Sequence, residues 1–186
     1  MSRSRRIPCA LLVLVSAAMA PLHAQSRPVF FMMSAGPAVP IGSFSDGYGA
    51  GWSATAAVGT TLSKVLEVRG SLGYSRFGAS GGVDASSAPV TVSGDVLYRL
   101  GREGAKARPY LVGGLGFASV GSSYDYSYEG GGNYGGSGRE NALVVGAGAG
   151  LLVQAGRTGF FAEGRLVSIG SGHSHVPLAV GVRVGR

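Results

Sequence analysis

Two stretches decide the fold of this chain: KVLEVRGSLGYSR at residues 64–76 and VTVSGDVLYRL at residues 90–100. Apolar and polar residues alternate in both, so Val68 and Leu72 fall on one face of a strand while Glu67 falls on the other. The apolar face and the charged face cannot both pack against a soluble core. The alternation therefore predicts strands of a barrel in lipid, apolar outside and polar inside.

Residues 1–24 have the order of a secretory signal peptide. Arginines precede an apolar run at residues 10–15, and small residues lead to Ala24. This is a basic region, a short apolar region and a small residue at the cleavage point. We therefore expect export, cleavage after Ala24 and a barrel domain over residues 25–186, with an uncleaved N-terminal anchor as the alternative.

Composition excludes disulfides and thiolate metal sites from the mature chain, because the one cysteine, Cys9, lies in the export segment. Part of the formal net charge of +7 belongs to that segment too. Basic residues also gather around one predicted turn, which would suit nucleic acid or an anionic lipid surface. They are Arg99, Arg102, Lys106 and Arg108. With an export signal present, we expect no nucleic acid as a partner.

Alternation of the same kind continues along the chain and predicts eight strands. Each meets the ~9 to 11 residues that a tilted strand needs to cross a bilayer, whereas no apolar run reaches the ~18 to 20 residues of a spanning helix. The strands are expected at residues 29–39, 50–61, 64–76, 90–100, 109–120, 141–153, 158–169 and 176–184.

Short and long connections alternate between these strands. Outer-membrane barrels have tight periplasmic turns and long external loops, so both ends of the barrel domain are expected in the periplasm. Aromatic residues at both rims support this orientation, because amphipathic rings gather at the two membrane interfaces. Trp52, Tyr74 and Phe117 are expected at the external rim, and Tyr98, Tyr110 and Phe160 at the periplasmic rim.

Three further stretches carry a family resemblance: AGPAVPIG at residues 35–42, RPYLVGGLG at residues 108–116 and VPLAVGVRV at residues 176–184. With them the mature chain resembles the small outer-membrane β-barrel domain family, of the eight-stranded OmpA and OmpX type. The resemblance implies an all-β, eight-stranded antiparallel up-and-down transmembrane β-barrel in the outer membrane of a Gram-negative bacterium. It implies no shared catalytic residues. Such barrels usually end on an aromatic residue, whereas this sequence ends Val184-Gly185-Arg186.

Seven charged residues occupy inward positions in the periplasmic half of their strands. Isolated charges removed from water are costly, so these side chains are expected to pair with one another. They are Glu67, Arg69, Asp95, Arg99, Glu163, Arg165 and Arg183. Above them the inward residues are small, among them Ser53, Thr55 and Ser75, which predicts a wet vestibule that opens outward.

Two short motifs invite a chemical interpretation. Gly146, Gly148 and Gly150 resemble a dinucleotide-binding loop, but the next glycine of that motif is missing, so the inward face of a strand is preferred. SGHSH at residues 171–175 offers histidines and a serine to a weakly bound metal or to a hydrolase of the lipid A deacylase kind. No carboxylate is placed to orient a base, so a solvated polar turn is preferred there.

The connection at residues 121–140 concentrates Tyr124, Tyr126, Tyr128 and Tyr134 among glycines. Tyrosine supplies contact area at a low entropic cost and glycine lets the backbone adapt, so this external loop is the expected binding surface. Continued alternation through the first three tyrosines would instead extend the flanking strands as a hairpin. Glycine-rich disorder is the third interpretation.

We expect a structural or surface-interaction role, in which the external loops contact an extracellular protein or surface ligand. The expected protein is a monomer in outer-membrane lipid, with no metal or cofactor and no enzymatic activity. A lipid-modifying hydrolase and a narrow, porin-like pore are the functional alternatives, although eight strands leave an interior just filled by side chains. A soluble secreted β-sandwich is the alternative fold.

Overall fold

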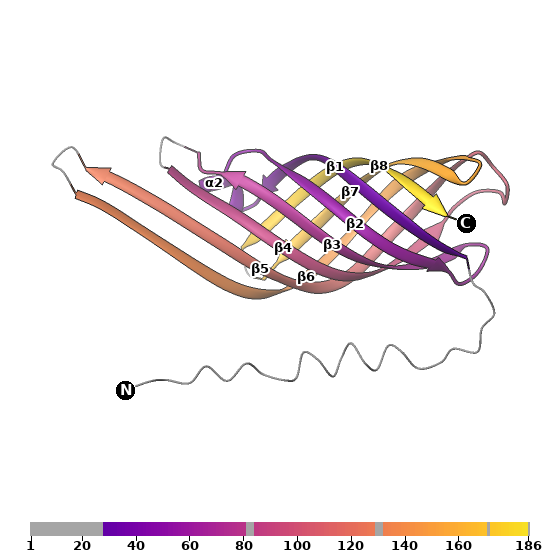
Figure 1. Cartoon of the computed structure of the whole chain (residues 1–186), viewed down its shortest axis with the longest axis horizontal. Coiled ribbons are helices and arrows are strands. Elements are labelled where there is room, and N and C mark those ends of the chain that lie inside the picture. The colour runs from indigo at the N-terminus through magenta and orange to yellow at the C-terminus, as the bar shows by residue number, and fades with distance from the viewer. Residues whose placement is uncertain (1–27, 81–83, 129–131, 171, 186) are drawn as a thin grey trace, which may run out of the picture.

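The computed structural model describes residues 28–80, 84–128, 132–170 and 172–185. It is a closed barrel of eight strands, in which each strand pairs antiparallel with its sequence neighbours and β1 pairs with β8 (Figure 1). A short helix, α2 (Phe44–Gly47), follows β1, and in the described part of the chain no helix is long and apolar enough to cross a membrane. The strands are β1 (Val29–Ile41), β2 (Gly51–Thr61), β3 (Leu66–Gly78), β4 (Asp84–Arg99), β5 (Ala107–Tyr128), β6 (Gly132–Ala155), β7 (Thr158–Ile169) and β8 (His173–Gly185).

The expected eight-stranded up-and-down barrel is confirmed, whereas the expected signal peptide lies outside the described residues. We call the end with the β1–β2, β3–β4, β5–β6 and β7–β8 connections the long-hairpin end, and the opposite end the short-turn end. The barrel begins and finishes at the short-turn end, where Phe30 pairs with Gly185.

The outward face of the barrel is an apolar belt to which all eight strands contribute. Phe31, Val92 and Phe117, for example, are 59%, 60% and 72% exposed. In water a belt of this size would drive association, whereas lipid buries it. Closure of the sheet also gives each strand a hydrogen-bonded neighbour on both sides, as the interior of a bilayer requires. The same pattern that disfavours a soluble sandwich therefore suits a transmembrane barrel.

Most of the aromatic residues expected at the rims are exposed on the outward face, namely Trp52, Tyr74, Tyr98, Phe117 and Phe160. The prediction for Tyr110 is wrong. Its side chain is 3% exposed and lies inside, because alternation along β5 puts it in the same inward row as Arg108 and Val112. The hydroxyl group finds a buried partner there, which compensates for its removal from water.

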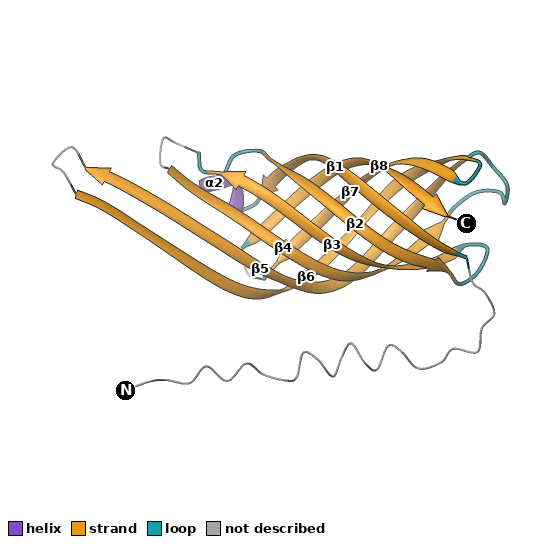
Figure 2. Ribbon diagram, in the orientation of Figure 1, coloured by secondary structure: helices purple, strands orange, loops and turns teal. Residues whose placement is uncertain are grey.

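The main departure from the predicted strands is the length of the β5–β6 hairpin, which projects beyond the rest of the barrel in Figure 2. The strands predicted at residues 109–120 and 141–153 run instead over Ala107–Tyr128 and Gly132–Ala155. The expected loop at residues 121–140 is therefore mostly paired strand. Pairing between the two strands is continuous to Tyr128 opposite Gly132, so the glycines of this segment do not end β6.

Candidate functional site

The charged residues expected in the lumen meet there in two ion-pair groups. The first, which we call the Glu67 group, lies nearer the short-turn end and consists of Glu67, Arg99 and Arg183. Both terminal nitrogens of Arg183 donate to the Glu67 carboxylate, at 2.8 and 2.7 Å, and Arg99 donates to it as well. Thr61 Oγ1 adds a fourth donor at 3.0 Å. The carboxylate, whose side chain is 1% exposed, is thus enclosed by donors, as a buried charge requires.

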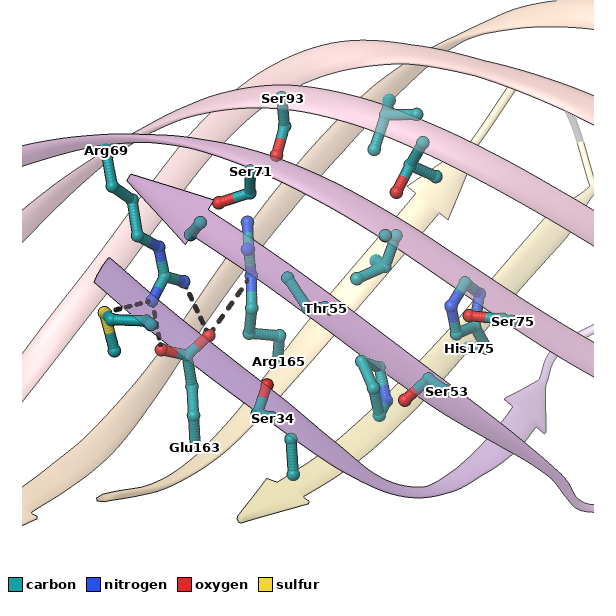
Figure 3. A pocket seen from close by; sticks show the side chains of 18 of the residues that line it. Ser34, Ser53, Thr55, Arg69, Ser71, Ser75, Ser93, Glu163, Arg165 and His175 are labelled. Atoms are coloured by element: carbon teal, nitrogen blue, oxygen red, sulfur yellow. Dashed lines mark hydrogen bonds and ion pairs between the residues drawn. The ribbon is translucent and has the colours of Figure 1, made fainter. Parts of the chain in front are cut away.

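The second group, the Arg69 group, consists of Arg69, Asp95, Glu163 and Arg165. It lies next to the Glu67 group, further from the short-turn end. Arg69 joins the two carboxylates: its Nε donates to Asp95 at 3.0 Å and its terminal nitrogens donate to Glu163 at 3.0 and 2.7 Å. Arg165 donates to both oxygens of Asp95, at 3.1 and 2.9 Å. Figure 3 shows Arg69 and Arg165 turned toward Glu163. These side chains come from β3, β4 and β7, so the group bridges the lumen.

Tyr110 and Ser71 complete the Arg69 group. The Tyr110 hydroxyl donates to Glu163 at 2.8 Å, and Ser71 Oγ donates to Asp95 at 2.9 Å. Sequence reasoning missed the role of Tyr110, although a signal existed: it stands two residues after Arg108, a position that alternation keeps on the same face.

Glycines of β6 make room for these large side chains. A Cβ atom at Gly148 would meet the backbone of Gly164 and Arg165, and one at Gly150 would meet the ring of Tyr110. The glycine motif therefore lies in a strand against lumen side chains, and it has neither the loop nor the following helix of a dinucleotide site. Close side-chain approach is the reason for glycine here.

Apolar side chains fill the space around the Glu67 group. The Arg183 guanidinium lies 3.7 Å from the centre of the Phe30 ring, in cation–π geometry. Phe30 belongs to a buried cluster with Met32, Leu97, Tyr110, Val112, Leu152 and Phe161. The short-turn half of the lumen is therefore packed with side chains.

A cavity of about 70 Å³ lies on the long-hairpin side of the Arg69 group, lined by small polar side chains such as Ser53, Thr55 and Ser75 (Figure 3). This volume admits water, since one molecule needs only ~10–15 Å³ of this measure. At the long-hairpin end of the lumen, Ala38, Phe44 and Phe77 form a buried cluster that we call the aromatic cap. No pattern in the sequence signals the cap, because Phe44 belongs to α2, a helix of four residues inside an expected loop.

The histidines near the end of the chain pack under this cap, so the prediction of a solvated turn is wrong. His175 is 3% exposed and its ring centre lies 5.1 Å from that of Phe77, while His173 lies 5.2 Å from Phe44. Among the described atoms His175 Nδ1 has no hydrogen-bond partner, so no carboxylate orients this ring as a hydrolytic base would need. Within the same described residues, no three potential metal ligands converge.

The β5–β6 hairpin is the second candidate site. β5 pairs with β4 as far as Asp125 opposite Asp84, but β6 pairs with β7 only from Val144 onward. Leu143 still accepts a backbone hydrogen bond from Gly170 at 2.9 Å, so in the described chain residues 132–142 of β6 pair with β5 alone and present one free edge. An edge of this kind offers backbone donors and acceptors to another extended segment. The backbone of Tyr124, Tyr126, Tyr128 and Tyr134 lies in this hairpin, and their side chains lie outside what the structure describes.

The chain matches no protein-family model and no curated protein sequence. Its fold matches solved outer-membrane proteins. Neisserial surface protein A has 18% sequence identity and a TM-score of 0.56, over 84% of this chain and 96% of its own. Ail, the attachment invasion locus protein of Yersinia pestis, has 14% identity and a TM-score of 0.61, over 86% and 99%. A major outer membrane protein from Thermus thermophilus has 14% identity and a TM-score of 0.60, over 88% and 100%. At these identities the similarity shows the fold, that of small eight-stranded outer-membrane barrels.

Proposed function

We propose that this protein is an outer-membrane surface protein, in which the β5–β6 hairpin contacts a partner outside the cell and the barrel is its anchor. The hairpin itself is the observation that carries the proposal. Residues 132–142 extend past the last backbone contact with the β7 side, which at about 3.3 Å per residue is a contour of roughly 36 Å. Strands of this length exceed what crossing the bilayer requires.

The composition of the hairpin supports a contact role. Its tyrosines can supply interface area and its free β6 edge can pair with an extended segment of a partner. Two proteins of the same fold have names that refer to the surface or to attachment, Neisserial surface protein A and the attachment invasion locus protein. We extend a surface role of that general kind to this chain, with an extracellular protein or other surface ligand as the partner.

The proposal sets the orientation of the barrel. The long-hairpin end faces outward and the short-turn end faces the periplasm, following the usual asymmetry of such barrels. Residues 1–24 act as a cleaved export signal, which the intact mass of the membrane-inserted protein tests. The protein works as a monomer whose apolar belt contacts lipid, and the proposal assigns it no enzymatic activity.

The test replaces Tyr124, Tyr126, Tyr128 and Tyr134 together by serine. Interface tyrosines that act as hot spots contribute about 2 kcal/mol or more each, so binding of host cells or matrix by bacteria displaying the variant should be lost. Barrel folding should not change, as judged by heat-modifiable migration on gels. The matched control replaces Ser122, Ser123, Ser127 and Ser137 of the same hairpin by alanine and should retain binding.

Two outcomes would contradict the proposal. If both variants bound like the parent protein, the hairpin would not be the contact surface. If binding survived the tyrosine replacement and disappeared in a His173→Ala and His175→Ala double variant, the start of β8 would be the working site.

A further inference from the structure

A second cavity, of about 370 Å³, lies at the short-turn end, where the β4–β5 and β6–β7 turns approach each other. Four cationic side chains line it: Arg99, Lys106, Arg108 and Arg183. Leu152, Gln154 and several glycines form the rest of the wall, and none of the described lining residues carries a carboxylate. Three of these cations belong to the basic turn seen in the sequence, whereas Arg102 of the same turn does not line the cavity; Arg102 and Lys106 are both exposed residues.

The charges around this cavity do not balance. Glu67 is the nearby acid, and it is fully occupied by Arg183, Arg99 and Thr61. Asp95 and Glu163 are held by Arg69 and Arg165. Glu103, on the β4–β5 turn, is 62% exposed and pairs with Lys64 at 3.0 Å. Arg108 and Lys106 thus face the cavity with no ion-pair partner among the described residues.

Unmet hydrogen-bond donors point to the same place. The Nε atoms of Arg99 and Arg108 are buried and have no acceptor in the described structure. The one hydrogen bond described for Arg108 is a long contact, 3.4 Å, from Nη2 to the backbone oxygen of Lys64. Buried donors without acceptors are costly, and water could satisfy their geometry but not neutralise their charge. An anion with several acceptor oxygens satisfies both requirements.

We propose that this cavity, lined by Arg99, Lys106, Arg108 and Arg183, is a binding site for a phosphate group. The four cations exceed the one nearby carboxylate, Glu67, by three charges, which suits a dianion better than a single carboxylate, and guanidinium groups bind phosphate oxygens in pairs. The cavity is open to solvent on one side, which leaves room for the remainder of a phosphate ester. In the orientation proposed above it opens to the periplasm, where the ester is either a soluble metabolite or the headgroup of an inner-leaflet phospholipid.

The test measures inorganic phosphate binding by calorimetry to the mature chain in phosphatidylcholine nanodiscs, with ionic strength held constant by NaCl. Arg108→Gln should weaken binding about tenfold or more and the Lys106→Gln/Arg108→Gln variant should weaken it further, because charge-assisted hydrogen bonds are lost. Both variants leave the Glu67 group intact. The control, Arg102→Gln, removes the same charge from the same turn outside the cavity and should keep the affinity within about twofold, since this side chain does not line the site and its charge acts only through screened solvent.

A second measurement distinguishes a loss of phosphate binding from a loss of folding. Phosphate should raise the urea midpoint of the parent protein and of Arg102→Gln, but not that of the double variant, because a ligand stabilises the state that binds it. Absence of phosphate binding to the parent protein, or equal weakening by Arg102→Gln and Arg108→Gln, would overturn the proposal. This result would not bear on the hairpin, which lies at the other end.

Nanodiscs that contain phosphatidic acid separate the two sources of the ligand. If the headgroup enters the cavity, phosphatidic acid should compete and lower the apparent affinity for inorganic phosphate. If the affinity is unchanged, the ligand is a soluble phosphate ester. Either result supports the phosphate site and identifies the source of its ligand.

Discussion

Glu67 holds two arginines from opposite sides of the sequence, Arg99 and Arg183, in a position where its own side chain is 1% exposed. Replacing it by glutamine keeps the shape but removes the charge. We expect Glu67→Gln to lower the free energy of unfolding by about 3 kcal/mol, because two buried cations lose their counter-ion. Urea unfolding in lipid vesicles measures the change.

The matched control for this substitution is Glu103→Gln, which breaks the exposed pair with Lys64. An exposed pair contributes at most about 1 kcal/mol, so its loss should hardly move the transition. Equal effects of the two substitutions would mean that the lumen is wet enough to screen the Glu67 group.

At the level of residues, alternation alone indicated which charges face inward, because a strand offers only two faces. It did not indicate which charge pairs with which, since partners such as Arg69 and Glu163 come from strands on different parts of the barrel wall. Tyr110 shows the limit of composition as a guide: an aromatic residue near a strand end suggested a membrane rim, while its row on β5 placed it inside.

At the level of elements, β6 combines an inward glycine row with an ordinary apolar outward row. We expect Gly150→Ala to destabilise the barrel by about 1 to 3 kcal/mol, because its Cβ would meet the Tyr110 ring and displace the hydroxyl from Glu163. The control is Gly94→Ala on β4, where nothing lies within 4 Å of the added atom. That change should alter the free energy of unfolding, measured with urea, by no more than about 0.5 kcal/mol. A similar loss at both positions would show that strand flexibility, and not packing against Tyr110, determines the effect of replacing glycine.

The strand ends were the least predictable feature of the elements. The glycine-rich segment before Asn141 suggested a loop, but its backbone groups are paired along β5, so local composition was overridden by the partner strand. The aromatic cap was beyond sequence reasoning for a different reason, because it unites Ala38 of β1, Phe44 of α2 and Phe77 of β3. Only the closed barrel brings these segments together.

For the whole molecule, the aromatic cap lies at one end of the lumen and packed side chains fill the other. We expect no steady ion conductance in planar bilayers, from the parent protein or from Phe77→Ala. The substitution should instead open the cavity from one side. A cysteine introduced at Ser75, which lines the cavity, should react slowly with a membrane-impermeant thiol reagent in the parent protein and quickly in Phe77→Ala.

The absence of cysteine from residues 28–186 makes this labelling specific. Ser137→Cys, which is exposed on the β5–β6 hairpin at the same end of the barrel as the aromatic cap, should react quickly in both backgrounds and serves as the control. Unitary current steps in the parent protein, or rapid labelling at position 75 without the Phe77 substitution, would show that the lumen is open.

The ion pairs of the lumen also constrain the order of assembly. Arg69 and Glu163 are 94 positions apart in the chain, and Glu67 and Arg183 are 116 apart. Neither pair can form in a flat sheet, where β7 and β8 lie four and five strands from β3, so the sheet must curl before they meet. Before these pairs form, the same arginines and carboxylates must stay hydrated, which opposes insertion of a partly formed sheet into the hydrocarbon of the bilayer. Insertion and closure are thereby coupled, and the ion pairs inside the barrel form late in assembly.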